Sequence, residues 1–343
     1  MRELIVAIIT LIVGFIFLIK GADFFVDGSA SVAKRLRVPS IIIGMTVVAM
    51  GTSLPECAVS VTASITNNNS LAVSNAVGSN IFNLMVVCGV CALFTPLAVQ
   101  RDTLKRDLPF SIIVAGLLLV LGYFGMTLGR VDGIILLVVF AVFLVIMVKS
   151  ALKARRDGDI TAAEQEDQEI ADEVEILPVW KCIVFIVVGA IGIALGGDAV
   201  VNGASVIAAE FGLSQTLIGL TIVALGTSLP ELVTSIVAAR KNEVDMALGN
   251  VIGSNIFNIL FVLGIAAAIS PIQFIRENII DIILLIFMSL EVWFFAQSKK
   301  KLTRGEGIVM LLVYAVYMVY ICKRSACKMI ENPGKRDYNI KNW

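Results

Sequence analysis

The sequence predicts an all-α polytopic membrane protein whose ten transmembrane helices form two inverted five-helix repeats. The first observation is composition: the 343-residue chain is 58% hydrophobic and only 16% charged, whereas soluble domains carry about 25% charged residues. The second is a set of ten apolar segments, each near the ~20 residues that cross about 30 Å of hydrocarbon. The third is an internal duplication of the sequence.

The apolar segments alternate with short polar stretches along the chain. We expect the spans near residues 4–33, 39–65, 70–95, 105–124, 130–150, 179–208, 214–239, 245–269, 277–297 and 305–322. The first and the sixth are long enough to be strongly tilted. Their second halves carry Asp23 and Asp27, and Asp198 and Asn202. Because polar groups are costly in lipid, these four side chains are expected to face protein or water.

Two motifs carry the duplication. The sequence GTSLPE at 51–56 returns at 226–231, and GSNIFN at 78–83 returns at 253–258. The displacement is 175 residues in both cases, and the two halves align without a gap around both motifs. Such self-similarity at a fixed distance indicates that the chain contains one structural unit twice.

Five helices per repeat is an odd number, so the second repeat must enter the membrane upside down relative to the first. Inverted repeats of this kind recur in secondary transporters, with the substrate site at the midplane between the repeats. We therefore divide the chain into a first repeat (1–150), an acidic linker (151–178), a second repeat (179–325) and a polar C-terminal tail (326–343).

The charges in the short loops predict the orientation. Lys and Arg gather after the first, third, seventh and ninth segments, and cytoplasmic loops carry this excess. The linker 151–178 is therefore predicted to be cytoplasmic and both termini external, in a multi-pass protein of the cell (plasma or inner) membrane. The tail, with Lys323, Arg324, Lys328, Lys335, Arg336 and Lys341, is basic against this trend. We weight the earlier loops more because the first helices usually dominate insertion.

The linker opens basic and then turns acidic from Asp157 to Glu175. A calcium-sensing EF-hand that starts at Asp157 would need Gly at position 162 and Glu at position 168, where this chain has Ala162 and Gln168. A solvated connection between the repeats is the favoured interpretation.

Composition also excludes several kinds of function. The chain has no His, which removes histidine metal sites, histidine proton relays and Ser-His-Asp catalysis. Its formal net charge is zero and it has no basic stripe, so no nucleic-acid partner is expected. The six Cys are scattered, and the Cys88/Cys91 pair on a predicted span is interpreted as small packing residues. We expect no cofactor, no obligate protein partner and no removable signal peptide; the surroundings are the lipid bilayer.

The repeated GTSLPE motif places Glu56 and Glu231 at membrane depth, where a carboxylate costs several kcal/mol unless it is compensated. Two carboxylates at matching positions predict one shared cation site. The alternative is a structural proline kink, which is common in membrane helices. A Glu directly after each proline, duplicated with the motif, favours the cation site. Because Pro55 lacks an N–H and clashes with the preceding turn, backbone carbonyls near Ala49 to Thr52 are expected to be free.

The polar residues around the two carboxylates are hard oxygen donors. Thr52 and Glu56 are four residues apart and share a helix face, as do Ser79 and Asn83. The second repeat supplies mirrored positions. Such a donor set favours Na⁺, Ca²⁺, Mg²⁺ or Mn²⁺ over Zn²⁺ or Cu²⁺. One Ca²⁺ or a few Na⁺ would neutralise two carboxylates, so one pocket can hold either ion in turn, which is what antiport requires.

These paired motifs resemble the alpha-repeats of the sodium/calcium exchanger family within the calcium/cation antiporter superfamily. The resemblance covers both repeats and implies ten helices, alternating access and a central site with four ion positions. The ligands that it implies are Ala49, Thr52, Ser53, Glu56, Ser79 and Asn83, with Ala224, Thr227, Ser228, Glu231, Ser254 and Asn258.

Asn258 bears on the subfamily. Potassium-dependent members have Asp at this place, whereas this chain has Asn in both repeats, which argues against K⁺ co-transport. The proton-coupled branch resembles GNxxE with histidines nearby, which this chain lacks. A simpler interpretation of Asn83 and Asn258 is hydrogen bonding between helices.

The function that follows is secondary antiport of Na⁺ against Ca²⁺, normally extruding Ca²⁺, and no enzymatic activity. The alternatives are exchange with H⁺ or of another divalent cation, and, from other classes, a passive channel or an intramembrane enzyme. A channel more naturally uses rotational symmetry around a pore. The only aspartate pair available to a hydrolase is Asp23 with Asp198, at helix ends.

Overall fold

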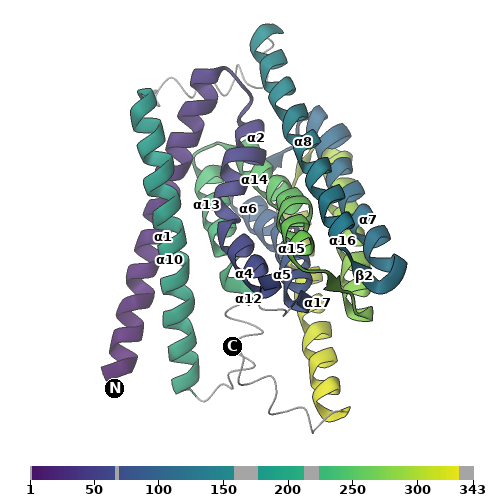
Figure 1. Cartoon of the computed structure of the whole chain (residues 1–343). Helices are drawn as coiled ribbons and strands as arrows, with labels where there is room; N and C mark the ends of the chain where they lie inside the picture. The colour runs from purple at the N-terminus through teal and green to yellow at the C-terminus, as the bar shows by residue number, and fades with distance from the viewer. Residues whose placement is uncertain (1, 66–68, 158–176, 212–223, 332–343) are drawn as a thin grey trace.

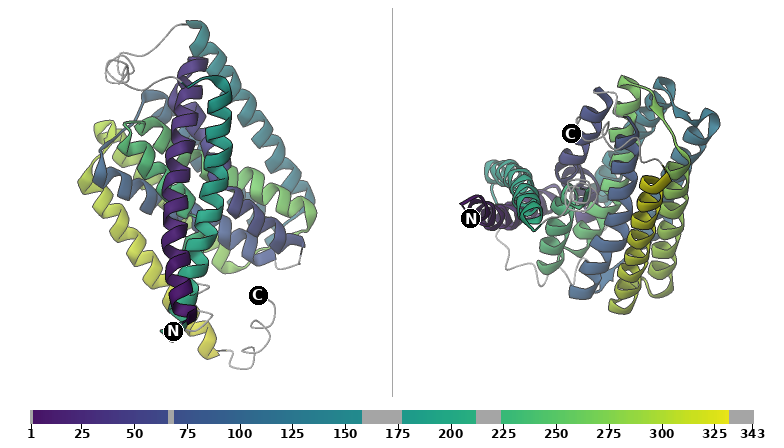
Figure 2. Two further views of the ribbon diagram at one scale, coloured as in Figure 1. Left: turned by 90° about the vertical axis from the view of Figure 1, so that its left-hand side faces the viewer. Right: turned by 90° about the horizontal axis from the view of Figure 1, so that it is seen from below.

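A computed structural model describes residues 2–65, 69–157, 177–211 and 224–331, and nearly all of them are α-helical. Two long helices, α1 (Arg2–Leu36) and α10 (Val179–Glu210), lie side by side along one flank of the molecule (Figure 1). The remaining helices form a bundle next to this pair, which is clearest from below (Figure 2).

The two halves repeat the order of their main helices and strands. The first half continues as α2 (Ser40–Ile43), η1 (Gly44–Val48), α3 (Ala49–Thr52), α4 (Leu54–Ile65), α5 (Asn69–Phe82), η2 (Asn83–Val87), α6 (Cys88–Phe94), β1 (Leu97–Ala98), η3 (Thr103–Asp107), α7 (Leu108–Tyr123), η4 (Phe124–Met126), β2 (Thr127–Leu128) and α8 (Arg130–Asp157). The second continues as α12 (Ala224–Gly226), α13 (Leu229–Arg240), α14 (Val244–Phe257), η6 (Asn258–Val262), α15 (Leu263–Ile269), β3 (Ile272–Gln273), α16 (Arg276–Lys299), β4 (Lys301–Leu302) and α17 (Arg304–Glu331). The first half has two additional short elements, η3 and η4, around α7.

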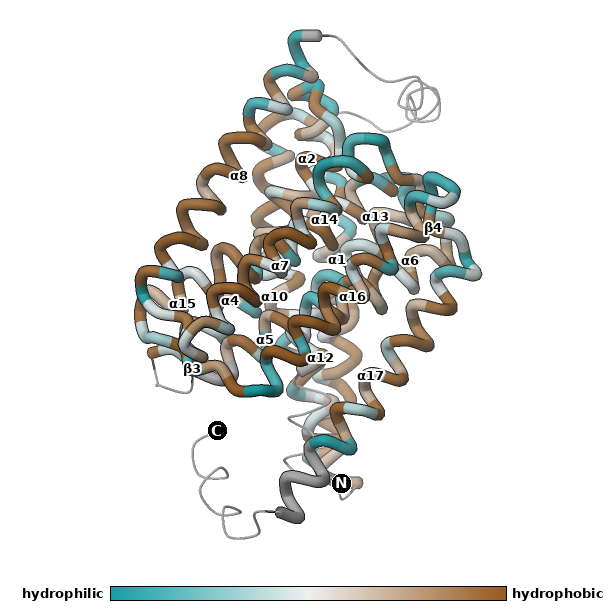
Figure 3. Tube along the Cα trace, turned by 90° about the vertical axis from the view of Figure 1, so that its right-hand side faces the viewer, coloured by the Kyte–Doolittle hydropathy of each residue, from teal (hydrophilic) through white to brown (hydrophobic). Residues whose placement is uncertain are grey.

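The described residues contain eight helices long and apolar enough to cross a membrane, or nine if the bent pair 40–52 and 54–65 is one span. The seventh predicted span, 214–239, lies partly outside the described residues, so the count of ten remains a prediction. Apolar residues cover most of the outer helices in Figure 3. The most buried spans are 72–94 and 244–269, which places the GSNIFN motifs at the centre of the bundle.

Two short antiparallel strand pairs join the halves reciprocally. Strand β1, after the third helix of the first half, pairs with β4, after the fourth helix of the second. Strand β2, after the fourth helix of the first half, pairs with β3, after the third helix of the second. This exchange of partners is what two repeats related by a two-fold axis produce.

The direction of the long helices confirms that the second half is inverted. The N-terminal end of α1 and the C-terminal end of α17 lie at one end of the molecule (Figure 1). The end of α8 at Asp157 and the start of α10 at Val179 lie at the opposite end. There Arg35, at the end of α1, donates a hydrogen bond of 3.0 Å to the carbonyl of Leu177.

The second predicted span is broken at the GTSLPE motif, as the proline requires. The segments 40–52 and 54–65 meet at an angle of 50°, and Ser53 between them leaves helical geometry with φ −86° and ψ 12°. Pro55 then occupies the first turn of α4, where its missing N–H costs nothing. In one detail the structure differs from the sequence argument: the Ala49 carbonyl accepts a hydrogen bond of 3.1 Å from the Ser53 N–H, so a cation bound there would share this oxygen with that donor.

Glycines spaced by seven residues bring α1 and α10 into backbone contact. A Cβ on Gly196 would lie 2.5 Å from the Leu18 nitrogen, and a Cβ on Gly21 would lie 2.7 Å from the Ile193 nitrogen. Small residues at such contacts let membrane helices pack closely. The two long helices therefore form one tightly packed pair.

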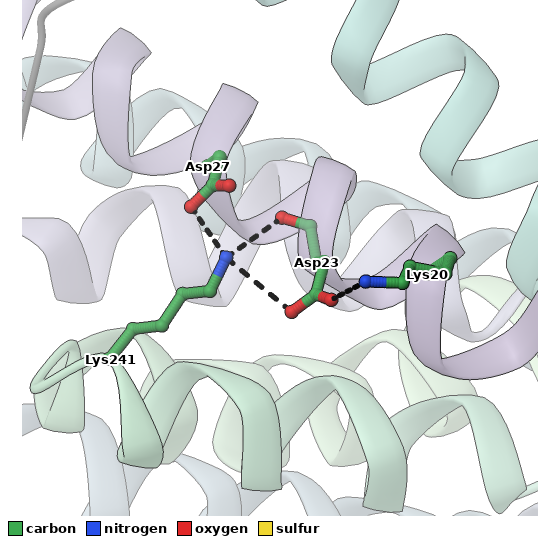
Figure 4. Close-up of polar contacts among 4 residues, drawn as sticks. All are labelled: Lys20, Asp23, Asp27 and Lys241. Carbon is green, nitrogen blue, oxygen red and sulfur yellow. Dashed lines mark hydrogen bonds and ion pairs between the residues drawn. The ribbon is translucent and has the colours of Figure 1, made fainter.

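The polar positions on α1 face a lysine from the bundle (Figure 4). Lys241 Nζ lies 2.7 Å from Asp27 Oδ1 and 3.5 Å from Asp23 Oδ1. Asp23 and Asp27 thus face protein, as predicted. The matching residues of α10, Asp198 and Asn202, are exposed, and Asn202 lines a groove of about 520 Å³ with Glu3 and others.

The predicted packing role of the cysteine pair is consistent with its position. Cys88 and Cys91 are each 1% exposed and belong to the main hydrophobic core. The proposed EF-hand region lies within 158–176, outside the described residues.

Candidate functional site

Two buried carboxylates meet where the halves meet. Glu56 and Glu231 lie in the first turns of α4 and α13, and both are 0% exposed. A helix N-terminus carries a partial positive charge that stabilises an anion in its first turn. The break before Leu54 and before Leu229 therefore supplies part of the compensation that each carboxylate needs.

Each carboxylate is held by a serine of the other repeat. Ser53 Oγ donates a hydrogen bond of 2.7 Å to Glu231 Oε1. Reciprocally, Ser228 Oγ donates one of 3.1 Å to Glu56 Oε1. Both serines occupy the position at which their helix is broken. The break thus aims a hydroxyl across the interface between the repeats.

Further hydroxyls surround this pair unequally. Ser79 Oγ lies 3.0 Å from Ser228 Oγ, whereas its counterpart Ser254 has no hydrogen-bond partner among the described residues. Thr52 Oγ1 donates to Asn250 Oδ1 at 3.1 Å. Its counterpart Thr227 lies beside Glu56, and its Oγ1 has no partner in good hydrogen-bond geometry among the described residues. The sequence repeat is therefore symmetric while its hydrogen bonds are not.

Asn83 and Asn258 stand where α5 and α14 pass into π-helical turns. Their Nδ2 groups donate to the opposite repeat, Asn83 to Asn255 Oδ1 at 3.3 Å and Asn258 to Asn80 Oδ1 at 3.1 Å. Hydrogen bonding between helices, the alternative interpretation of these two residues, is therefore also observed. The amide oxygens of both residues have no hydrogen-bond partner in the part of the chain that the structure describes.

Unpartnered buried oxygens test whether these residues suit a cation. Ten buried side-chain polar atoms have no hydrogen-bond partner among the described residues. Six belong to predicted ligand residues: Glu56 Oε2, Glu231 Oε2, Asn83 Oδ1, Asn258 Oδ1, Thr227 Oγ1 and Ser254 Oγ. Buried polar atoms are normally satisfied, and Ca²⁺ takes six to eight oxygen ligands. The donor set therefore fits a hard cation.

The structure brings most of the predicted residues together and leaves two less defined. The Ala49 carbonyl is occupied by the Ser53 N–H and lies 3.4 Å from Thr52 Oγ1. Ala224 begins α12, and its surroundings lie mostly in the undescribed residues 212–223. The other ten lie on the broken helices and the two central helices.

Sequence reasoning missed a second set of polar residues that hold the broken helices. Asn75 Nδ2 donates to the Glu56 carbonyl at 3.3 Å and to Ser60 Oγ at 3.1 Å. Asn250 Nδ2 donates to the Glu231 carbonyl at 3.5 Å and to Ser235 Oγ at 2.9 Å. These residues obey the same 175-residue displacement, so the duplication contained the signal that identifies them.

Comparisons with known proteins place this chain among membrane cation exchangers. The family model described as "Sodium/calcium exchanger protein" matches residues 6–149 and 181–323. The putative antiporter CaxA of Alkalimonas amylolytica is 39% identical over 92% of this chain and 98% of that relative. The sodium/calcium exchanger MaX1 of Methanosarcina acetivorans is 31% identical over 91% and 97%.

A solved exchanger structure is similar to this chain in three dimensions as well. The sodium-calcium exchanger NCX_Mj, soaked with zero Na⁺ and Ca²⁺, superposes with a TM-score of 0.80 at 32% identity, over 93% of this chain and 99% of that one. The fold and site define a helical membrane exchanger of cations. The chain belongs to the sodium/calcium exchanger protein family.

Proposed function

We propose that this protein is a secondary antiporter that exchanges Na⁺ for Ca²⁺ by alternating access and uses the Na⁺ gradient to extrude Ca²⁺. The observation that carries the proposal is the buried pair Glu56 and Glu231, whose second carboxylate oxygens have no hydrogen-bond partner among the described residues. Buried carboxylates in a membrane protein mark ion pathways.

The charge of the site explains how two ions can share it. Two ionised glutamates supply a charge of −2, which one Ca²⁺ or two Na⁺ neutralise, and a third Na⁺ can occupy neighbouring neutral oxygens. The ligands that we assign are the twelve that the family resemblance implies, from Ala49 to Asn258. Because both ions need the same carboxylates, they bind in turn rather than together, which couples their movements.

The contacts across the repeats support alternation. Each glutamate shares its Oε1 with a serine of the opposite repeat. Thr52 and Ser79 have hydrogen-bond partners, whereas their counterparts Thr227 and Ser254 have none among the described residues. Inverted repeats support two states by exchanging such conformations. We place the linker 151–178 in the cytoplasm of a cell-membrane protein, with both termini outside.

Purified protein in liposomes tests the proposal and separates the alternatives. Internal Na⁺ is varied against choline, and Ca²⁺ uptake is measured with and without an opposing pH gradient. We expect uptake that requires internal Na⁺. Uptake driven by the pH gradient alone would identify a cation/proton exchanger instead, and uptake without any counter-gradient at constant voltage would identify a channel.

A further inference from the structure

Two buried asparagines, Asn80 and Asn255, are not among the twelve assigned ligands, yet they form the centre of the interface between the repeats. Asn80 is 0% exposed and Asn255 is 2% exposed. Asn80 Nδ2 donates to the backbone carbonyl of Asn255 at 3.0 Å. Asn255 Nδ2 donates to the backbone carbonyl of Asn80 at 3.2 Å. Each side chain is therefore hydrogen-bonded to the main chain of the other residue.

Because each side chain donates to the other residue's backbone carbonyl, the orientation of both amide groups is determined. A backbone carbonyl only accepts hydrogen bonds, so the NH₂ group of Asn80 must face Asn255 and its Oδ1 must face away. That Oδ1 can only accept, so it dictates the orientation of the next amide. Its partner is Asn258 Nδ2, at 3.1 Å. By the same steps, Asn255 Oδ1 accepts from Asn83 Nδ2 at 3.3 Å.

The chain of hydrogen bonds ends at two ligand oxygens. With Nδ2 bound, the Oδ1 atoms of Asn83 and Asn258 are left buried and without a partner in the described structure. A hard cation binds an amide through its oxygen, and a rotated amide would present N–H groups to it. We propose that Asn80 and Asn255 are positioning residues, each of which holds the ligand amide of the opposite repeat with its oxygen available to the transported cation.

This inference rests on the proposed function and adds to it which positioning residue acts through which ligand. Asn80 acts through Asn258, and Asn255 acts through Asn83. If Asn80 and Asn255 only held the repeats together, their contribution to the fold would not depend on which ligand asparagine is present. Crossed double-mutant cycles therefore separate the two roles, because residues that act through one another are not additive whereas independent ones are.

The experiment measures equilibrium Ca²⁺ binding and the KM for Ca²⁺ of Na⁺-driven uptake. Asn80→Leu, similar in volume but unable to hydrogen-bond, is combined with Asn258→Ala and, separately, with Asn83→Ala. As a single variant, Asn80→Leu is expected to weaken Ca²⁺ affinity by about 10- to 100-fold, as loss of a ligand's supporting hydrogen bond does. In the Asn258→Ala background we expect its effect to shrink to about twofold or less, while in the Asn83→Ala background it stays in full.

Ser64→Ala is the matched control, because Ser64 Oγ makes another buried contact between the repeats, 2.6 Å to the Ala266 carbonyl. It should leave Ca²⁺ affinity unchanged. If Asn80→Leu fails to give monodisperse protein, Asn80→Ser, too short to reach Asn258, takes its place in both cycles. Equal losses in both backgrounds, or unchanged affinity in the single variant, would overturn the inference. A wild type that neither binds nor exchanges Ca²⁺ would instead overturn the proposed function.

Discussion

Ser53 Oγ donates a hydrogen bond of 2.7 Å to Glu231 Oε1, across 178 residues of sequence. The bend of the first repeat thereby holds the carboxylate of the second, and Ser228 does the same for Glu56. One oxygen of each carboxylate is oriented by the opposite repeat, and the other has no partner in the described chain.

Ser53→Ala should weaken Ca²⁺ binding without abolishing exchange. The variant removes a hydrogen bond to Glu231 and an assigned ligand hydroxyl while both carboxylates remain, so we expect the KM for Ca²⁺ to rise by about 10- to 100-fold. Ser289→Ala is the control, since Ser289 Oγ donates within its own helix, to the Leu285 carbonyl at 2.7 Å. A KM equal to that of the wild type would mean that Ser53 does not support the site.

Exchange should respond to membrane potential. If one Ca²⁺ alternates with three Na⁺, each cycle moves one net charge, which is worth about 2.3 kcal/mol per 100 mV. The potential is set with a potassium ionophore in liposomes while the Na⁺ gradient is kept constant. A rate that is indifferent to potential would indicate electroneutral exchange.

Asn258→Asp should make exchange sensitive to pH or to K⁺. A carboxylate cannot donate to Asn80 Oδ1, and it adds a third negative group near Glu56 and Glu231. It will therefore keep a proton or recruit another monovalent cation. Na⁺-driven Ca²⁺ uptake is measured with K⁺ replaced by choline and with pH stepped from about 6 to 8. We expect the wild type to be indifferent to K⁺ at controlled voltage; strong dependence there would contradict the subfamily assignment.

Gly196→Ala should destabilise the paired helices α1 and α10. The added Cβ would lie 2.5 Å from the Leu18 nitrogen and 2.8 Å from the Gly14 carbonyl oxygen, and overpacking of this kind costs about 1–3 kcal/mol. Gly116→Ala is the control, because its Cβ meets no heavy atom within 4 Å. Thermal unfolding in detergent measures both; an unchanged midpoint for Gly196→Ala would show that the pair separates readily.

The duplication and the membrane spans were predictable because each has a sequence signal that does not depend on context. A displacement of 175 residues and an odd number of spans per repeat are enough to predict inversion. The family resemblance then supplied the twelve proposed ligands. The proline predicted the break, which lies at Ser53, two residues before Pro55.

The hydrogen bonds that order the site were not predictable, because they cross between the repeats. No local pattern indicates that Asn80 contacts Asn255 rather than lipid or its own helix. The Ala49 carbonyl is occupied because the chain turns at Ser53, one residue after the expected loosening. Thr52 and Thr227 differ in their hydrogen bonds because the structure shows one conformation of the protein. A symmetric sequence cannot specify which repeat makes which set of bonds.

Replacement of either site carboxylate tests the central claim most directly. Glu56→Gln and Glu231→Gln each keep the side-chain shape and remove half of the site charge. Each is purified, checked for an unchanged elution profile, and assayed for Na⁺-driven ⁴⁵Ca²⁺ uptake beside the wild type and Ser64→Ala. We predict that both control proteins transport Ca²⁺ and that both glutamine variants have no measurable exchange. Near-normal Ca²⁺ flux in either glutamine variant would contradict the shared cation site.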